Sequence, residues 1–266
     1  MIVHEPTVIA LGPLVLSGYG LALAASMLLG YLVVAREYRR LGVPAQALED
    51  IIVVLLVAVV GAKLYDMATG NAALWSRSGF SMVGGALASL PTMWWLTARR
   101  AVQPACIADA MALGAAAAIP VARSGCWAIG DDYGRPFDGA WAVAFPHGAP
   151  PSTVHTFRTQ FGEPLSGLDA ATVLTVHPTQ LYELALSFAI FLWLWHRRRT
   201  TPTWTTAGAF LALSAGERFV VEFVRAKTDR TLPGDLTITQ AVTLALLLLG
   251  STLWWQRSRR RDIAVR

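Results

Sequence analysis

One stretch of the sequence places arginines and a glutamate inside an apolar run. Arg218, Glu222 and Arg225 are spaced i, i+4 and i+7, which puts them on one face of a helix. A charge at bilayer depth costs at least about 2.5 kcal/mol, so such a cluster needs partners or water to receive it. Arginine can bind phosphate through two parallel N–H donors, and the spacing therefore predicts an anion site in which Glu222 orients Arg218. An internal ion pair that locks two helices together is the alternative.

A second polar stretch runs from Arg123 to Arg135 and follows an apolar run over 107–122. It contains two arginines, two aspartates, a cysteine and three glycines. These residues combine charge with a backbone free to bend, which predicts a polar site where a hydrophobic segment ends. The alternative is an ordinary helix C-terminus, with Gly125 and Gly130 as stop signals.

A third motif, His177-Pro-Thr-Gln-Leu-Tyr-Glu183, opens another apolar run. Glu183 suits the positive end of the helix that the motif begins. His177 is either a capping or surface residue or, as a neutral imidazole near pH 7, a proton acceptor. Tyr19 lies between two glycines in an aliphatic run, where it could hydrogen-bond a lipid headgroup or act as an interfacial anchor.

The composition indicates a bilayer protein. Of the 266 residues, 55% are hydrophobic and only 15% are charged, and the mean hydropathy is +0.48. Basic residues lie between the apolar runs instead of clustering on a polar face, which argues against a nucleic-acid partner. The two cysteines, Cys106 and Cys126, cannot form a disulfide framework, and no CxxC or His/Cys cluster indicates a metal. We expect neither a metal nor a cofactor.

Seven apolar runs approach the roughly 20 residues needed to cross a bilayer. They cover residues 13–35, 48–68, 82–97, 107–122, 179–195, 206–224 and 238–255. The sequence therefore predicts an all-α, polytopic integral membrane protein with seven transmembrane helices and a single transmembrane domain over 1–266. The Pro- and Gly-rich gap over 131–176 is predicted to form a small extracytoplasmic cap between spans four and five.

Basic residues determine the predicted orientation. More than half of the 22 Lys and Arg residues lie in alternate connections or at the C-terminus, at 36–40, 99–100, 197–199 and 257–266. By the positive-inside rule these segments are cytoplasmic, so the N-terminus lies outside and the C-terminus in the cytoplasm. Residues 123–135 and 225–237 then meet at the outer leaflet.

Taken together, the motifs resemble the prolipoprotein diacylglyceryl transferase family. The resemblance covers essentially the whole chain and rests on three motifs in the family's order and spacing. These are Arg123-x-Gly125 with Gly130-Asp-Asp-Tyr-Gly-Arg-Pro136 and Trp141-Ala-Val-Ala-Phe-Pro146, then His177-Pro-Thr-Gln-Leu-Tyr-Glu183, then Arg218-Phe-Val-Val-Glu-Phe-Val-Arg225. Weaker matches lie upstream at Tyr19-Gly20, Gly61-Ala-Lys-Leu-Tyr65 and Gly84-Gly85.

The resemblance implies an enzyme with seven transmembrane helices in the bacterial inner membrane. Family members transfer the diacylglyceryl group of phosphatidylglycerol to the lipobox cysteine of a prolipoprotein, forming a thioether and releasing glycerol phosphate. The implied partners are phosphatidylglycerol, prolipoprotein signal peptides with a lipobox cysteine, and membrane lipids.

The resemblance also assigns roles to residues. It puts the phosphate-binding arginine at Arg123, a second essential arginine at Arg218 with its partner Glu222, and the acidic signature position, usually glutamate, at Asp131. The predicted catalytic residues are Asp131, His177, Glu222 and Arg218. The predicted substrate-binding residues are Arg123, Tyr19, Gly84, Gly85, Gly134, Gln180, Tyr182 and Arg225.

The sequence departs from the family pattern at several positions. Val83 replaces the histidine that usually precedes Gly-Gly in the third span and is the proposed general base. Asparagines are expected where Cys126 and Ile129 stand, and a tyrosine where Ser214 stands. His177, Asp131 or Glu222 would then accept the thiol proton.

Two alternatives follow from these departures. One is a related lipid transferase with altered chemistry, in which Cys126 is a nucleophile activated by Arg123. The other is a non-catalytic family member that binds phospholipid or lipoprotein precursors.

Overall fold

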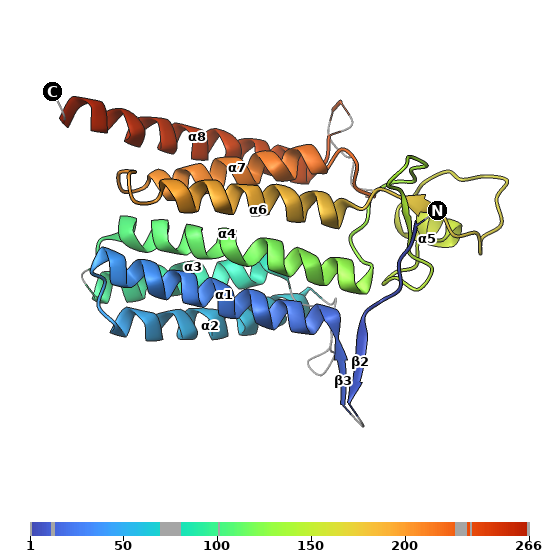
Figure 1. Ribbon diagram of the computed structural model, residues 1–266, viewed down its shortest axis with the longest axis horizontal. Helices are drawn as coiled ribbons and strands as arrows, with labels where there is room; N and C mark the ends of the chain where they lie inside the picture. The colour runs from blue at the N-terminus through green and yellow to red at the C-terminus, as the bar shows by residue number, and fades with distance from the viewer. Residues whose placement is uncertain are drawn as a thin grey trace. The chain divides into compact units, whose positions relative to one another are not determined.

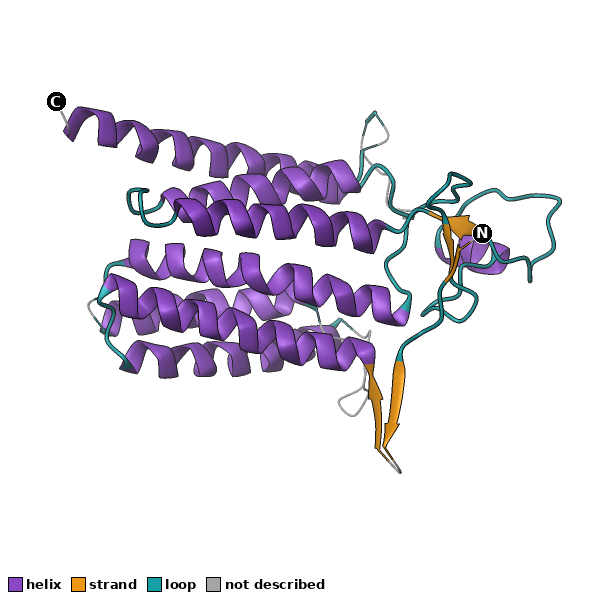
Figure 2. Ribbon diagram, in the orientation of Figure 1, coloured by secondary structure: helices purple, strands orange, loops and turns teal. Residues whose placement is uncertain are grey.

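The computed structural model describes residues 2–11, 14–69, 81–100, 102–226, 233–234 and 236–264. Within these residues the chain is mostly helical (Figure 1). The helices are α1 Gly18–Leu41, α2 Gln46–Ala68, α3 Met82–Arg99, α4 Pro104–Ile129, α5 Val154–Gln160, α6 Thr179–Arg197, α7 Thr205–Val221 and α8 Ile238–Ala264. The strands, shown in Figure 2, are β1 Ile2–Val3, β2 Val8–Leu11, β3 Leu14–Ser17, β4 Val143–Ala144 and β5 Thr175–Val176.

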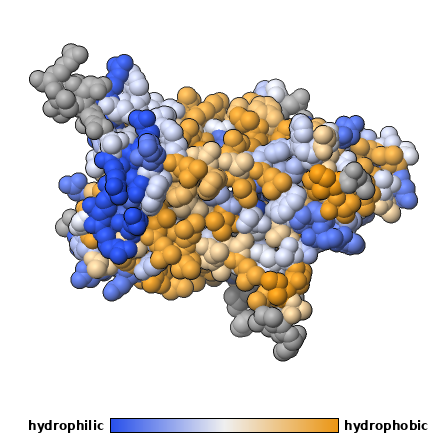
Figure 3. Space-filling model, viewed as in Figure 1, coloured by the Kyte–Doolittle hydropathy of each residue, from blue (hydrophilic) through white to orange (hydrophobic). Residues whose placement is uncertain are grey.

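The helices present apolar surfaces of the kind that a bilayer covers. Helices α1, α2, α4 and residues 238–259 of α8 are long and apolar enough to cross a membrane. Large side chains such as Leu56 and Leu90 are more than 60% exposed, and hydrophobic residues cover much of the helical surface in Figure 3. The chain is therefore a polytopic membrane protein. Helices α3, α6 and α7 match the other three predicted spans, and their crossing of the bilayer stays a prediction.

Each predicted apolar run overlaps a helix, but several ends differ, and two of the differences have a clear structural cause. The first run was expected from Pro13, which lies outside the described residues, but Leu14–Ser17 is a strand paired antiparallel with Val8–Leu11. Hydrophobicity alone does not distinguish an aliphatic strand from a helix. At the base of the hairpin, the Gly18 amide donates a 2.8 Å hydrogen bond to the Thr7 carbonyl. The fourth run was expected to end at Ala122, whereas α4 continues to Ile129 and stops at Gly130, whose φ is 72°.

The chain forms two compact units. The second unit, Tyr31–Met111, contains α2, α3 and the adjoining parts of α1 and α4. Helices α2 and α3 pack at glycines, since a β-carbon at Gly84 would lie 2.5 Å from the Gly61 carbonyl oxygen. In the same unit, Arg100 donates two hydrogen bonds to Asp50, at 2.8 and 2.9 Å.

The first unit, Met1–Gly30 with Ala112–Arg266, holds the other helices and the strands. Helices α7 and α8 pack closely, because a β-carbon at Gly250 would lie 2.5 Å from the Ala212 nitrogen. Helices α1 and α4 meet at Gly125, where a β-carbon would lie 2.9 Å from Cβ of Ala22. Gly125 thus has a packing role inside α4 and does not end the helix.

A small folded segment joins α4 to α6 in the first unit. Its three-stranded sheet has the order β1-β4-β5, with β1 parallel and β5 antiparallel to β4. Tyr133, Phe145, Phe157 and Val176 form its core. The predicted cap over 131–176 falls in this segment, but the participation of the N-terminal strand was not anticipated.

Candidate active site

A buried carboxylate, Glu183 in the second turn of α6, brings three arginines together. The Arg123 Nε atom from α4 lies 2.9 Å from its Oε2, and the Arg218 Nη1 atom from α7 lies 2.6 Å from its Oε1. Arg225 Nη1 approaches the same Oε1 at 3.4 Å. Glu183 is only 2% exposed, so these ion pairs are shielded from water. The two arginines predicted from separate motifs therefore share one partner.

Glu222 is the second buried carboxylate of the cluster. Its Oε2 lies 3.0 Å from Arg218 Nη2 and 3.9 Å from Arg225 Nε, and its Oε1 accepts a hydrogen bond from Thr237 at 3.3 Å. The pairing of Arg218 with Glu222 along α7 follows the i, i+4 spacing. The expectation that Arg225 lies on the same helix face is wrong, because α7 ends at Val221 with Glu222 as its C-cap.

Arg225 is positioned by a backbone junction instead. Gly134 and Arg225 form an antiparallel bridge, and the Arg135 amide donates to the Val224 carbonyl at 2.8 Å. A β-carbon at Gly134 would lie 2.4 Å from that Val224 oxygen and 2.7 Å from Cβ of His177. Gly134 therefore permits three chain segments to meet, and a contact between Gly134 and substrate stays a prediction.

Asp132 is the third carboxylate that contacts the arginines. Its Oδ2 accepts a hydrogen bond from Arg123 at 3.1 Å, and its Oδ1 accepts one from Arg225. The Asp132 backbone has φ 59°, and its carbonyl accepts a 2.6 Å hydrogen bond from Thr179. Partial burial alone would raise the pKa of Asp132, but Arg225 and Arg123 hold it below its usual value.

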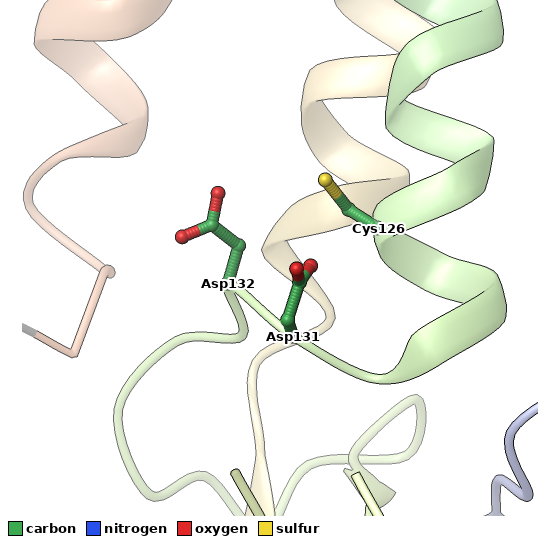
Figure 4. Close-up of side chains that lie close together, drawn as sticks. All are labelled: Cys126, Asp131 and Asp132. Carbon is green, nitrogen blue, oxygen red and sulfur yellow. The ribbon is translucent and has the colours of Figure 1, made fainter. Parts of the chain in front are cut away.

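Asp131 has a different environment from its neighbour. Figure 4 shows its carboxylate pointing toward the Cys126 thiol of α4, and the thiol donates a hydrogen bond to it. Its Oδ1 is buried and has no hydrogen-bond partner among the described residues. Burial and the negative charge of Asp132 raise the pKa of Asp131 to about 6. Gln180 donates to the Asp131 carbonyl and so fixes the loop.

Cys126, Asp131 and Asp132 have ligand atoms within 4.8 Å of one another, a spacing that could hold a metal ion (Figure 4). The guanidiniums of Arg123 and Arg225 already neutralise Asp132. Asp132 is therefore less available to a cation, and the expectation of no metal stays a prediction.

His177 and Tyr182 contact each other and the folded segment. The His177 ring stacks on Phe137 with 4.0 Å between centroids, and its Nδ1 lies 3.2 Å from the Tyr182 hydroxyl. Trp141 donates to that hydroxyl at 2.7 Å. Burial lowers the pKa of His177, which keeps the imidazole neutral at pH 7. The ring contacts described for His177 involve these aromatic residues and none of the three arginines.

The remaining predicted residues lie in both units. Tyr19 packs beside Gly125, since a β-carbon there would lie 3.4 Å from the tyrosine Cδ2. Gly84 and Gly85 lie in α3 of the other unit and pack against α2. The side chain of Val83 lies outside the described residues.

The site therefore combines three guanidiniums with three carboxylates that contact them, next to the Asp131 carboxyl group, whose pKa is raised. Such an arrangement can bind a phosphate through arginine donors and accept a proton beside it.

Comparison with protein families gives a match over residues 6–256 to prolipoprotein diacylglyceryl transferase. The chain belongs to this family. Several relatives are named phosphatidylglycerol–prolipoprotein diacylglyceryl transferase. The protein of Tolumonas auensis is 28% identical, with 94% of both chains covered, and that of Pseudomonas paraeruginosa is 28% identical, with 98% of this chain and 96% of the relative covered. The protein of Pseudomonas fluorescens is also 28% identical over 97% of this chain and 96% of its own.

For this member of the prolipoprotein diacylglyceryl transferase family, sequence reasoning missed two site residues. Glu183 was interpreted only as a favourable charge at a helix start, although it ends the motif that His177 begins. Asp132 was passed over in favour of Asp131. The signal for Glu183 was available, because a glutamate inside an apolar run needs a partner just as an arginine does.

Proposed function

We propose that the protein is a phosphatidylglycerol–prolipoprotein diacylglyceryl transferase of the bacterial inner membrane. It takes the diacylglyceryl group from phosphatidylglycerol, attaches it to the lipobox cysteine thiol of a prolipoprotein, and releases glycerol phosphate. The observation that carries this proposal is the convergence of Arg123 and Arg218, from different helices, on buried Glu183. Family membership supports the same reaction.

The chemistry requires positive charge where phosphate leaves. A thiolate sulfur attacks the terminal glycerol carbon of the diacylglyceryl group, the new C–S bond forms, and the C–O bond to phosphate breaks. The departing phosphate then carries the electron pair of that bond. Arg123 and Arg218 bind the phosphate and stabilise this charge, because preorganised donors act most strongly in a site shielded from water. Glu183 and Glu222 hold both guanidiniums in place before the reaction begins.

Among the three predicted proton acceptors, Asp131 is the best supported. Both carboxylate oxygens of Glu222 already have partners, Arg218 and Thr237. His177 is held by Phe137 and Tyr182. Asp131 has an unused buried oxygen and a pKa near 6, which suits a base that works close to neutral pH.

The proposed orientation places α3, α6 and α8 with their C-termini in the cytoplasm, as three of seven spans. Arginines there lie over tryptophan rings: Arg99 over Trp95 at 4.2 Å and Arg259 over Trp255 at 4.1 Å. Arg198 lies over Trp195 in the same way. Such pairs suit the headgroup level, where tryptophan and arginine both concentrate. Residues 131–176 then form an extracytoplasmic cap, where prolipoprotein signal peptides arrive.

Transfer from phosphatidylglycerol to a lipobox peptide by the purified protein tests the proposal. We expect release of glycerol phosphate and a thioether-linked peptide, and we expect Arg123→Ala to reduce transfer by at least about 100-fold. Arg158→Ala is the control, because Arg158 lies in α5 and bonds only to the Leu165 and Leu168 carbonyls among the described contacts. Lipid binding without released glycerol phosphate would instead support the non-catalytic alternative, which the replacement of the usual histidine by Val83 favours.

A further inference from the structure

The Asp132 carboxylate spans two guanidiniums of the arginine site. One oxygen accepts from Arg123 and the other accepts from Arg225. Two non-bridging oxygens of a phosphate ester would meet two arginines in the same way. Asp132 is therefore an internal anion in a position suited to a phosphate.

The three carboxylates that contact the arginines differ in how easily they could move away from them. The side chains of Glu183 and Glu222 are 3% exposed or less and lie in or at the end of a helix. The Asp132 side chain is 40% exposed and lies in the loop after α4. A carboxylate that already contacts water loses little when it moves into water, whereas moving Glu183 would expose a buried carboxylate that contacts all three arginines.

Charge balance gives a reason for one carboxylate to move. Arg123, Arg218 and Arg225 form ion pairs with Asp132, Glu183 and Glu222, so these three arginines are already balanced without the neighbouring Asp131. An added phosphate would give this cluster excess negative charge, which is unfavourable in a partly buried site. If Asp132 turns away, the phosphate takes over its two arginines. Arg225, only 4% exposed, then keeps an anionic partner.

The backbone around Asp132 allows its side chain to move alone. Thr179 bonds the Asp132 carbonyl and Gln180 bonds the Asp131 carbonyl, so the first turn of α6 holds the loop. Asp132 adopts a left-handed conformation with φ 59°, which aspartate and asparagine tolerate better than most residues. Rotation of the carboxylate needs no change in these contacts.

We propose that Asp132 is a specificity-determining counter-ion, which a phosphate ester displaces from Arg123 and Arg225 and which returns as the product phosphate departs. This inference rests on the proposed transferase function, because it concerns the same arginines. The phosphate ester is either the lipid headgroup or a soluble glycerol phosphate.

Asp132→Asn tests the counter-ion directly. Asparagine keeps the shape and accepts the left-handed backbone but lacks the charge. We expect purified Asp132→Asn in mixed micelles to bind phosphatidylglycerol, glycerol phosphate or both about three- to tenfold more tightly than the natural chain. Asp138→Asn is the charge-matched control, because Asp138 is exposed in the folded segment, and we expect it to leave both affinities unchanged. Diacylglycerol, which has no phosphate, should bind all three proteins equally.

The two ligands distinguish the two sources of phosphate. If Asp132→Asn binds phosphatidylglycerol more tightly, the lipid headgroup is the ligand that displaces Asp132. If it binds only glycerol phosphate more tightly, the soluble ester is that ligand. Unchanged or weaker binding of both ligands by Asp132→Asn would overturn the inference. Asp132→Glu keeps the charge and is expected to bind no more tightly than the natural chain. An equal gain in that variant would point to a disturbed loop and would also overturn the inference.

The binding measurements do not require turnover. If the natural chain releases no glycerol phosphate but Asp132→Asn binds a phosphate ester more tightly, the transferase proposal fails and the proposed counter-ion role of Asp132 stands. If transfer occurs and Asp132→Asn binds neither ligand more tightly, only the proposed counter-ion role of Asp132 is rejected.

Discussion

At the residue scale, the two adjacent aspartates have opposite electrostatic environments. Asp132 contacts two arginines and stays ionised, whereas Asp131 lies against Cys126 and has a pKa of about 6. The Asp131 carboxylate points toward the Cys126 thiol (Figure 4). Neighbouring carboxyl groups of different pKa can take different roles, one neutralising charge and the other exchanging a proton.

This difference predicts a pH dependence for transfer. A base acts only when deprotonated, so activity that depends on Asp131 should fall as the pH decreases through about 6. Asp131→Asn should lower the turnover number by about 100-fold or more and remove this acid limb, with phosphatidylglycerol binding retained. Rates measured between pH 5 and pH 8 on both proteins check the prediction. Asp131→Glu, which keeps a carboxyl group, should restore most of the activity, and an unchanged profile in Asp131→Asn would assign the proton to another group.

At the element scale, the site depends on one close contact between loops. Gly134 bridges Arg225, and the first turn of α6 bonds the neighbouring carbonyls. Arg225 reaches the cluster through this junction, since α7 has already ended.

Gly134→Ala should therefore disturb the arginine site without touching an arginine. Its β-carbon would lie 2.4 Å from the Val224 oxygen, so the segment after α7 that carries Arg225 must shift. We expect at least a tenfold loss of transfer and a lowered melting temperature, because a displacement of about 1 Å from the productive geometry is enough for such a loss. Gly216→Ala in α7 is the matched control, because its β-carbon meets only Cδ1 of Leu247, at 3.7 Å. Equal activity of the two variants would contradict the role given to Gly134.

The elements were more predictable from sequence than the contacts between them. A long apolar run identifies a helix because crossing a bilayer requires length and hydrophobicity, and both are local properties. Gly130, one of the two stop signals considered, does end α4, although the apolar run itself ended at Ala122. The hairpin before Gly18 was missed because hydropathy does not record backbone conformation. Arg123 and Arg218 stood out as charges in apolar surroundings. The role of Asp132 depends on Arg225, which only the folded chain brings near.

At the scale of the whole molecule, labelling of single cysteines from outside the cell tests the proposed orientation in the membrane. Asp169, exposed in the folded segment, should face the periplasm, whereas Gln103, between α3 and α4, should face the cytoplasm. In a background without Cys106 and Cys126, we expect a membrane-impermeant maleimide to label Asp169→Cys in cells whose inner membrane is intact. Gln103→Cys should react only after lysis, and the reverse pattern would invert the proposed orientation.

The N-terminal strand has a consequence for biosynthesis. Ile2 and Val3 are synthesised before α1 to α4, whereas their partners Val143 and Ala144 follow only after these helices. The three-stranded sheet consequently cannot close until more than half of the chain has been translated. Until then β1 has no partner strand, and a chain truncated before residue 143 cannot form this sheet.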